Sequence, residues 1–306
     1  MKTKVCILIL SIVIFAGAAT SCQHIMAVAD AGAQIAGAAG IVDQNVADAI
    51  SVSARAIGTA AEEITPHQEY YIGRAVAANI LGNYTLAASN AANNALTNYL
   101  NLICLAITIN SPRPDIFNGY RVAILESNEI NAFATSGGHI LVTRGLINAA
   151  RSEDALAGVI AHEIAHIQLQ HSIKAIRNSR ITQAIIVTGT ATAGAAAGMD
   201  VNQLTDVFNE SVGEIVQTLV NNGFSREQEF EADRTAMELM AAAGYNPQGL
   251  IEMLRQLGTV QTSGAGFGRT HPTPAARITE AEKTVRNHRV TDNSAARQAR
   301  FTAATR

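Results

Sequence analysis

One segment of this 306-residue chain, residues 155–170, constrains the fold more than any other. Apolar residues occupy nearly every face of it, which is typical of a helix buried on all sides. Three ionisable side chains, those of His162, Glu163 and His166, nevertheless fall within little more than one turn. Burying such groups is costly unless something organises them. We therefore expect a central buried helix whose three ionisable residues belong to one functional site.

The spacing of these residues indicates what kind of site this is. His162 and His166 are four positions apart, so their imidazoles lie on one helical face and converge on a single point. Glu163 can reach a water bound at that point, as the general base of a catalytic zinc site does. Two hydrogen-bonded core histidines with no metal are the alternative.

A catalytic zinc ion takes three protein ligands and keeps one position open. Ser225 and Gln228 form a capping box that predicts the start of a second helix. Glu229 on this helix is the candidate third ligand. Asp233, one turn later on the same face, can accept a hydrogen bond from a ligating histidine. The alternative is a solvated acidic run, which is the usual fate of such a segment.

Elsewhere the pattern predicts a predominantly helical α+β protein with a small sheet. Helices are expected at about residues 66–81, 90–109, 201–220, 225–243, from 246 onward and from 273 onward. Three short apolar segments predict strands at residues 120–126, 130–135 and 139–143, and Ser136-Gly137-Gly138 joins the last two as a hairpin. The domain is expected to span residues 65–289, preceded by an Ala/Gly-rich tether or weak helix over 22–64 and followed by a solvated tail over 290–306.

Residues 1–21 are laid out as a secretory signal, with two lysines, an apolar run and small residues ahead of Cys22. The sequence Ala19-Thr20-Ser21-Cys22 resembles the lipobox of bacterial lipoproteins. That resemblance implies that Cys22 becomes a lipidated N-terminus and ties the protein to a membrane. Ordinary cleavage near residues 16–18 and an uncleaved anchor are the alternatives.

Charge and the remaining segments exclude some classes of function. The formal net charge is −3 and no dense Lys/Arg block exists, so we expect no nucleic-acid partner. Cys104 lies in an apolar helical stretch and is expected to be a core residue. Residues 181–198 are uncharged but only weakly apolar, which favours a helix or lid over the site; a membrane span is the alternative.

Taken in order, the motifs resemble peptidase family M48. His-Glu-Ile-Ala-His and Ser-Arg-x-x-Glu-x-x-Ala-Asp are accompanied by Ile72-Gly73-Arg74, Asn131-Ala132-Phe133-Ala134, Val142-Thr143-Arg144-Gly145-Leu146, Gly244-Tyr245-Asn246-Pro247, His271-Pro272 and Arg277-Ile278. The similarity covers about residues 65–285. It implies a zincin-like fold with an edge hairpin near the metal helix. It also implies one zinc ion per chain on His162, His166 and Glu229, with Glu163 as base.

The resemblance bears on several other residues. In the family a late histidine lies near the metal, so His271 is a candidate catalytic donor to the oxyanion, or an occupant of the open position; a loop histidine without a role is the alternative. Arg277 is expected to pair with nearby carboxylates. His139 and His171 are expected to be exposed and receive no role. Tyr245 is expected to pack at a helix junction.

The leading hypothesis is a zinc endopeptidase of the bacterial cell envelope, lipid-anchored on the periplasmic side. Gln23, directly after Cys22, resembles lipoproteins of the outer membrane. Unfolded or misassembled envelope proteins are the expected substrates, bound as an extended strand along the hairpin strand 139–143. The alternative is a non-catalytic, zinc-containing assembly factor or holdase lipoprotein, which would not need Glu163.

Overall fold

The computed structural model of the chain describes residues 22–40, seven residues between 43 and 55, and residues 63–177, 213, 215–260, 270–271, 274–288 and 293–305. They belong to two compact units: Met1–Ile64 with Lys174–Ser211, and Thr65–Ile173 with Val212–Arg306. The expected signal, the lid or span at 181–198 and the side chain of Cys22 lie outside the described residues. Within the described part, no helix combines the length and the apolar character needed to cross a membrane.

The first unit contains a helix, α2 (Cys22–Ala38), in the segment expected to be a tether or weak helix. The described residues from 44 to 55 return antiparallel along it, and Gln34 Nε2 donates a hydrogen bond of 2.7 Å to Ser51 Oγ. Gly37 leaves no room for a side chain, because an added Cβ would lie 2.6 Å from the Cβ of Ala47. Small residues are therefore what allows these segments to approach each other.

The second unit contains a three-stranded sheet of β1 (Arg121–Leu125), β2 (Ala132–Thr135) and β3 (His139–Thr143). The strand order is β1-β3-β2. Gly137 and Gly138 both have positive φ angles, 77° and 94°, which glycine adopts readily in the tight turn between β2 and β3. The parallel pair runs from Arg121 opposite His139 to Leu125 opposite Thr143, and the antiparallel pair from Ala132 opposite Val142 to Thr135 opposite His139.

This topology corrects one prediction. Strand 139–143 does not offer a free edge, because β3 is the central strand and is paired on both sides. The reason is non-local: β1, which precedes the hairpin, joins it in parallel on the side that the sequence pattern leaves open. The edge strand of the hairpin is β2.

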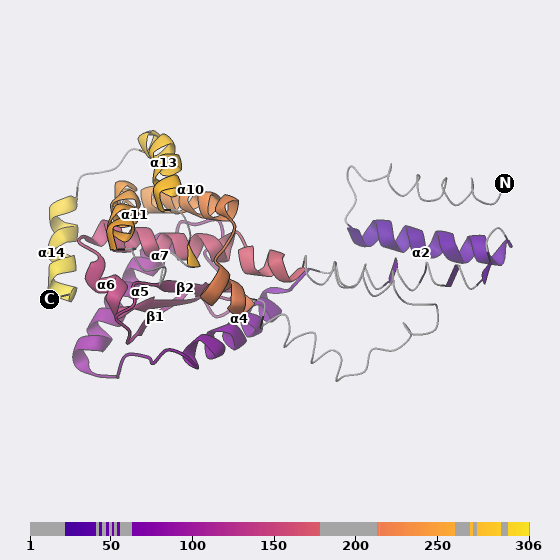
Figure 1. The fold of residues 1–306 in the computed structure, drawn as a ribbon, viewed down its shortest axis with the longest axis horizontal. Helices are drawn as coiled ribbons and strands as arrows, with labels where there is room; N and C mark the ends of the chain where they lie inside the picture. Colours follow the sequence, from indigo (N-terminus) through magenta and orange to yellow (C-terminus); the bar gives the residue numbers. More distant parts are fainter. Residues whose placement is uncertain are drawn as a thin grey trace. The chain divides into compact units, whose positions relative to one another are not determined.

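The helices of this unit surround a central one, α7 (Glu153–Gln168), whose residues from Ala155 to Ile167 are all buried. Figure 1 shows α7 between the sheet and the helices α10 and α11. The other elements are α4 (Pro66–Leu81), α5 (Ala91–Thr108), α6 (Arg144–Ala149), the π-helix η1 (Thr218–Asn222), α10 (Arg226–Ala242), α11 (Gln248–Val260), α13 (Pro274–Thr284), the 3-10 helix η2 (Val285–Asn287) and α14 (Ser294–Thr305). The predicted helical α+β architecture, with a small sheet beside the metal helix, is confirmed.

Local sequence signals explain where the principal helices begin. The capping boxes at Thr65 and Ser225 are both formed, and each cap residue accepts a hydrogen bond from the backbone N–H three residues later. Ser152 caps α7 in the same way, and Glu153 and Asp154 lie in its first turn, where the helix dipole favours negative charge. Because its start is fixed, α7 presents His162 and His166 at a defined point of the core.

The end of the chain differs from the expected solvated tail. Residues 294–305 form α14, whose Phe301 is buried in the main core. Arg297 Nε lies 2.9 Å from Asp154 Oδ1, and Arg300 Nε donates a hydrogen bond of 3.1 Å to Glu153 Oε2. The acidic first turn of α7 thus provides partners for two arginines of a helix about 140 residues away in sequence.

Candidate metal centre

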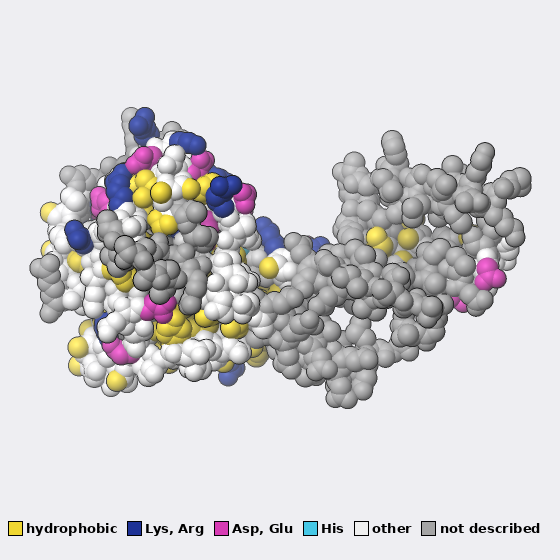
Figure 2. Space-filling model, in the orientation of Figure 1, with side chains coloured by type: hydrophobic (Ala, Val, Ile, Leu, Met, Phe, Trp, Pro, Cys, Tyr) yellow, Lys and Arg dark blue, Asp and Glu magenta, His cyan; other side chains and the backbone are white. Residues whose placement is uncertain are grey.

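Two helices and one loop bring four potential ligands together. His162 and His166 come from α7, Glu229 from the first turn of α10, and His271 from the segment before α13. One ligand atom of each lies within 4.8 Å of every other, and all four residues are buried. The three residues expected to bind zinc are therefore adjacent, and His271 joins them. No histidine is visible on the face of the described residues that Figure 2 shows.

The nitrogen and oxygen atoms of these four side chains lie close enough together to share one ion. The Nε2 atoms of His162 and His166 are 3.1 Å apart. Each of them lies 3.5 Å from a carboxylate oxygen of Glu229, and His271 Nδ1 lies 3.0 Å from Glu229 Oε1. Three ring nitrogens and a carboxylate form a donor set of the kind that zinc binds in proteins.

A buried atom supports the same conclusion. Glu163 is 1% exposed, and its Oε1 has no hydrogen-bond partner among the described residues. It lies 3.5 Å from His271 Nε2, at the margin of the cluster. An unsatisfied buried carboxylate oxygen is unusual unless a water, an ion or a substrate completes its environment. These residues therefore fit a metal centre with a base beside it.

Asp233 and Arg277 support the cluster from behind. His162 Nδ1 lies 2.9 Å from Asp233 Oδ1. Arg277, which is fully buried, donates to both oxygens of Asp233, from Nη2 at 2.6 Å and from Nε at 2.7 Å. Its Nη1 lies 2.9 Å from Glu229 Oε2. Arg277 thus pairs with carboxylates, as expected, and holds two of them in place at once.

Burial and this arginine shift the pKa values of three groups at the site. Burial by itself would raise the pKa of Asp233, but the adjacent Arg277 outweighs it and holds this pKa at about 2. Burial raises the pKa of Glu163 above its ordinary value and lowers that of His166 well below its ordinary value. Asp233 is therefore charged and His166 neutral, the form in which an imidazole binds a metal.

Sequence reasoning missed one histidine. His171 was expected to be exposed, yet it is 1% exposed and its Nδ1 lies 2.8 Å from His166 Nδ1. The chain reverses at Gln170, which has a φ of 55°, and this left-handed turn returns His171 towards His166. Glycine is the usual residue in such a turn, and because Gln170 stands there instead, the sequence does not predict the turn. Phe224, also missed, stacks on the His166 ring with centroids 4.2 Å apart.

His139 and Tyr245 lie outside the cluster. His139 begins β3 and is half-buried, with its ring 5.3 Å from that of Tyr70. Burial lowers its pKa. Tyr245 is 7% exposed and belongs to the main core after the end of α10, where Gly244 has a φ of 80°.

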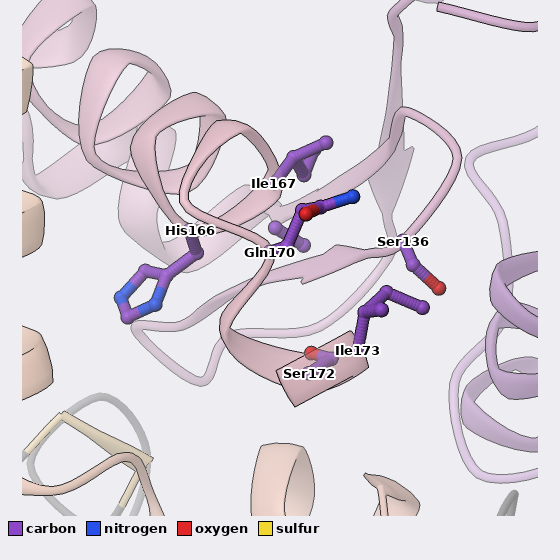
Figure 3. Close-up of a pocket in the computed structure, with 7 residues that line it drawn as sticks. Ser136, His166, Ile167, Gln170, Ser172 and Ile173 are labelled. Carbon is purple, nitrogen blue, oxygen red and sulfur yellow. The ribbon is translucent and has the colours of Figure 1, made fainter. Parts of the chain in front are cut away.

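A small pocket adjoins His166 but is separate from the ligand cluster. It is lined by Ala134, Ser136, His166, Ile167, Gln170, Ser172 and Ile173. In Figure 3 the imidazole of His166 points away from Ser136, Gln170 and Ile173. The pocket therefore lies where the end of α7 meets the hairpin, and His166 contributes one wall of it while its ring faces the ligands.

Comparison with known proteins agrees with this geometry. A family model described as peptidase family M48 matches residues 90–285. The chain is 30% identical over 160 residues to the mitochondrial metalloendopeptidase OMA1 of Schizosaccharomyces pombe, covering 50% of this chain and 43% of that protein. It is 26% identical over 195 residues to the β-barrel assembly-enhancing protease of Escherichia coli K12, covering 61% and 38%. It is 29% identical over 152 residues to the metalloprotease LoiP of the same organism, covering 49% and 57%.

This chain thus spans between 38% and 57% of the length of these three relatives. The region that matches the family model covers more than half of the chain and includes β1 to β3, α7, α10 and the segment of His271. A buried His-His-Glu cluster formed by α7 and α10 lies inside that region. The chain belongs to peptidase family M48.

Proposed function

We propose that this protein is a zinc-dependent endopeptidase in which His162, His166 and Glu229 hold one zinc ion. The observation that carries the proposal is the convergence of these three side chains, from two separate helices, beside the unsatisfied carboxylate of Glu163. A bound zinc ion supplies a Lewis acid that polarises the scissile carbonyl and makes water more acidic.

Glu163 is the proposed general base. It takes a proton from the attacking water through Oε1 and passes that proton to the leaving amine. Its position fits this role because Oε1 is buried, has no hydrogen-bond partner in the described part of the chain and lies beside the ligand cluster. Asp233 accepts a hydrogen bond from His162 Nδ1 and so keeps the opposite ring nitrogen available to the metal.

His271 has two proposed roles, and they predict opposite results. As a catalytic donor it would stabilise the oxyanion, so His271→Ala would lower activity. As an occupant of the open position in a resting state it would block substrate, so the same change would raise activity. Its Nδ1 is already 3.0 Å from Glu229 Oε1, and Thr270 Oγ1 secures the segment with a 3.0 Å hydrogen bond to Asn131 Oδ1. This placement favours the resting-state role.

Substrates are proposed to bind as extended strands along β2, the outer strand of the hairpin, whose four residues are buried in this structure and would have to be uncovered first. Thr143 N donates to Asn131 O at 3.0 Å, so the alternation of an antiparallel pair directs the backbone groups of Ala132 and Ala134 away from β3. Ala134 lines the pocket beside His166, which puts this edge near the cluster. Recognition through the backbone suits unfolded or misassembled proteins, because it needs little side-chain specificity.

The proposed location is the periplasmic side of the bacterial envelope, with a lipid on Cys22 and the outer membrane favoured. The lipobox-like residues 19–22 support it, and one relative is named a β-barrel assembly-enhancing protease. Replacing Cys22 by Ala together with a cleavable signal should release the protein into the soluble periplasmic fraction. Retention of that variant in the membrane fraction would contradict lipid anchoring.

The decisive experiment uses Glu163→Gln, with Glu238→Gln as matched control on the exposed side of α10. Zinc content and digestion of unfolded casein are measured for both variants and the parent, with and without chelator. We expect the Glu163 variant to retain zinc and lose proteolysis, while the control keeps both. A Glu163 variant that cleaves as well as the parent would refute the mechanism. A zinc-loaded parent that cleaves nothing, yet prevents casein from aggregating, would favour the holdase alternative.

A further inference from the structure

We propose that His171 is a positioning residue which, together with Glu231, fixes the tautomer and orientation of His166. The proposal rests on the proposed function, because it takes His166 as a metal ligand. It assigns a task to a buried histidine that the mechanism above does not use.

The contacts form a continuous chain from the ligand to the surface. His166 Nδ1 lies 2.8 Å from His171 Nδ1, and His171 Nε2 lies 3.3 Å from Glu231 Oε2. His171 is 1% exposed, whereas the side chain of Glu231 is 45% exposed. Phe224 holds the face of the His166 ring by stacking at 4.2 Å and 19°. The ring is thus constrained both in its plane and across its face.

Proton counting determines which nitrogen of His166 is free. A carboxylate only accepts hydrogen bonds, so Glu231 favours the His171 tautomer that carries its proton on Nε2. Nδ1 of that tautomer is an acceptor. At 2.8 Å it requires a donor, so His166 must carry its own proton on Nδ1. The Nε2 atom of His166 then presents a bare lone pair to Glu229 and His162, as a metal ligand must.

The opposite assignment fails for the same reason. If His171 donated from Nδ1, its unprotonated Nε2 would face the Glu231 carboxylate, and two acceptors would confront each other. His166 would then carry its proton on Nε2, where the metal should bind. The two ligating histidines are therefore supported differently: His162 directly by the buried Asp233, and His166 through a second imidazole.

The test measures zinc affinity in the full-length protein by competition with a chromophoric chelator. His171→Phe fills the space without accepting a hydrogen bond, and His171→Gln restores an acceptor and a donor. We expect the Phe variant to bind zinc about 10- to 100-fold more weakly, and the Gln variant to recover most of that loss. His67→Gln, on the exposed start of α4, is the control and should match the parent.

Two further readouts separate positioning from a general structural role. The visible absorption spectrum of the cobalt-substituted protein should change in the Phe variant, because a reoriented imidazole alters the ligand field. Glu231→Ala should weaken zinc binding by a smaller factor than His171→Phe, since Glu231 is half exposed and acts through His171. The melting temperature of each metal-free variant reports folding separately.

Each outcome decides the proposal. Unchanged affinity and cobalt spectrum in His171→Phe would overturn it, while the proposed peptidase would stand. If that variant does not fold, ¹⁵N NMR of zinc-loaded parent decides, since a proton on Nδ1 of His166 supports the proposal and its absence overturns it. A parent that binds no zinc overturns both. Zinc binding that depends on His171 in a protein without proteolytic activity would overturn the peptidase alone.

Discussion

The two halves of α7 are equally buried, but different forces hold them. In the half from residue 153 to 160, the side chains of Leu156 and Ile160 are fully buried in the apolar core, and the polar groups are confined to the first turn. In the half from 161 to 168, ionisable groups are buried and have ionisable partners. One helix therefore combines a half stabilised by hydrophobic transfer with a half that packs Ile164 and Ile167 in the same core but also depends on its polar partners.

The largest effect on stability is expected in the polar half. Arg277→Ala leaves the buried Asp233 and Glu229 without their shared cation. Removing one partner of a buried ion pair costs about 3–5 kcal/mol. Urea unfolding in the presence of chelator should show that the free energy of unfolding falls by this amount. If the free energy of unfolding fell by less than it does for an ordinary surface substitution, Arg277 would not be what stabilises these two buried carboxylates.

In the apolar half, Leu156→Ala should cost about 2–5 kcal/mol, because Leu156 is fully buried and its truncation leaves a cavity. Zinc affinity should stay within a few-fold of the parent, since no ligand or its hydrogen-bond partner changes. Urea unfolding and chelator competition on one preparation measure both quantities. If zinc affinity fell together with stability, the two halves would be coupled and the contrast between them would fail.

Metal removal should affect the polar half selectively. With free zinc at 100 times the dissociation constant, binding to the folded state alone adds about 2.7 kcal/mol. Chelator should therefore lower the melting temperature of the parent. The melting temperature of His166→Ala should respond much less, because this variant lacks one proposed ligand. An equal response in the two proteins would place the stabilising metal elsewhere.

The smallest effect is expected where α14 pairs with the first turn of α7. The side chain of Arg300 is 57% exposed, and the buried carboxylate of Glu153 keeps a 2.9 Å hydrogen bond from Tyr99 Oη when Arg300 is removed, so the pair contributes little more than a surface salt bridge. Arg300→Ala should cost about 0.2–1 kcal/mol, and less in high salt. Arg277→Ala, which truncates the arginine beside the polar half of α7, is the variant for comparison. Comparable losses of unfolding free energy in the two variants would remove the distinction between a pair that is buried on both sides and one whose arginine is exposed.

The predictions that the structure bears out came from local sequence patterns, namely helical spacing and capping boxes. The spacing of His162 and His166 follows from helical periodicity, and the capping box at Ser225 fixed where α10 begins and so where Glu229 lies. Tertiary pairing produced what the sequence did not predict. The central position of β3 depends on β1, and the burial of His171 depends on a left-handed Gln170. Neither leaves a periodic signal.

Contacts between residues distant in sequence also explain why α14 was not predicted. Its residues are rich in alanine and arginine, a composition that fits a solvated tail equally well. Only the acidic first turn of α7 and the core site that receives Phe301 give the segment a preferred position. A helix whose partners lie about 140 residues earlier in the chain cannot be recognised from its own window of sequence.

The position of β2 at the edge of the sheet has a consequence for which proteins would be degraded if substrates bind there. Recognition through the backbone groups of Ala132 and Ala134, which point away from β3, would select for little beyond an available main chain. A client's susceptibility would then follow the fraction of time that a stretch of it is locally open, and not its sequence. Each 1.4 kcal/mol lost from a client's local stability would raise its turnover about tenfold. Such an enzyme would monitor the folding state of its neighbours without recognising any of them individually.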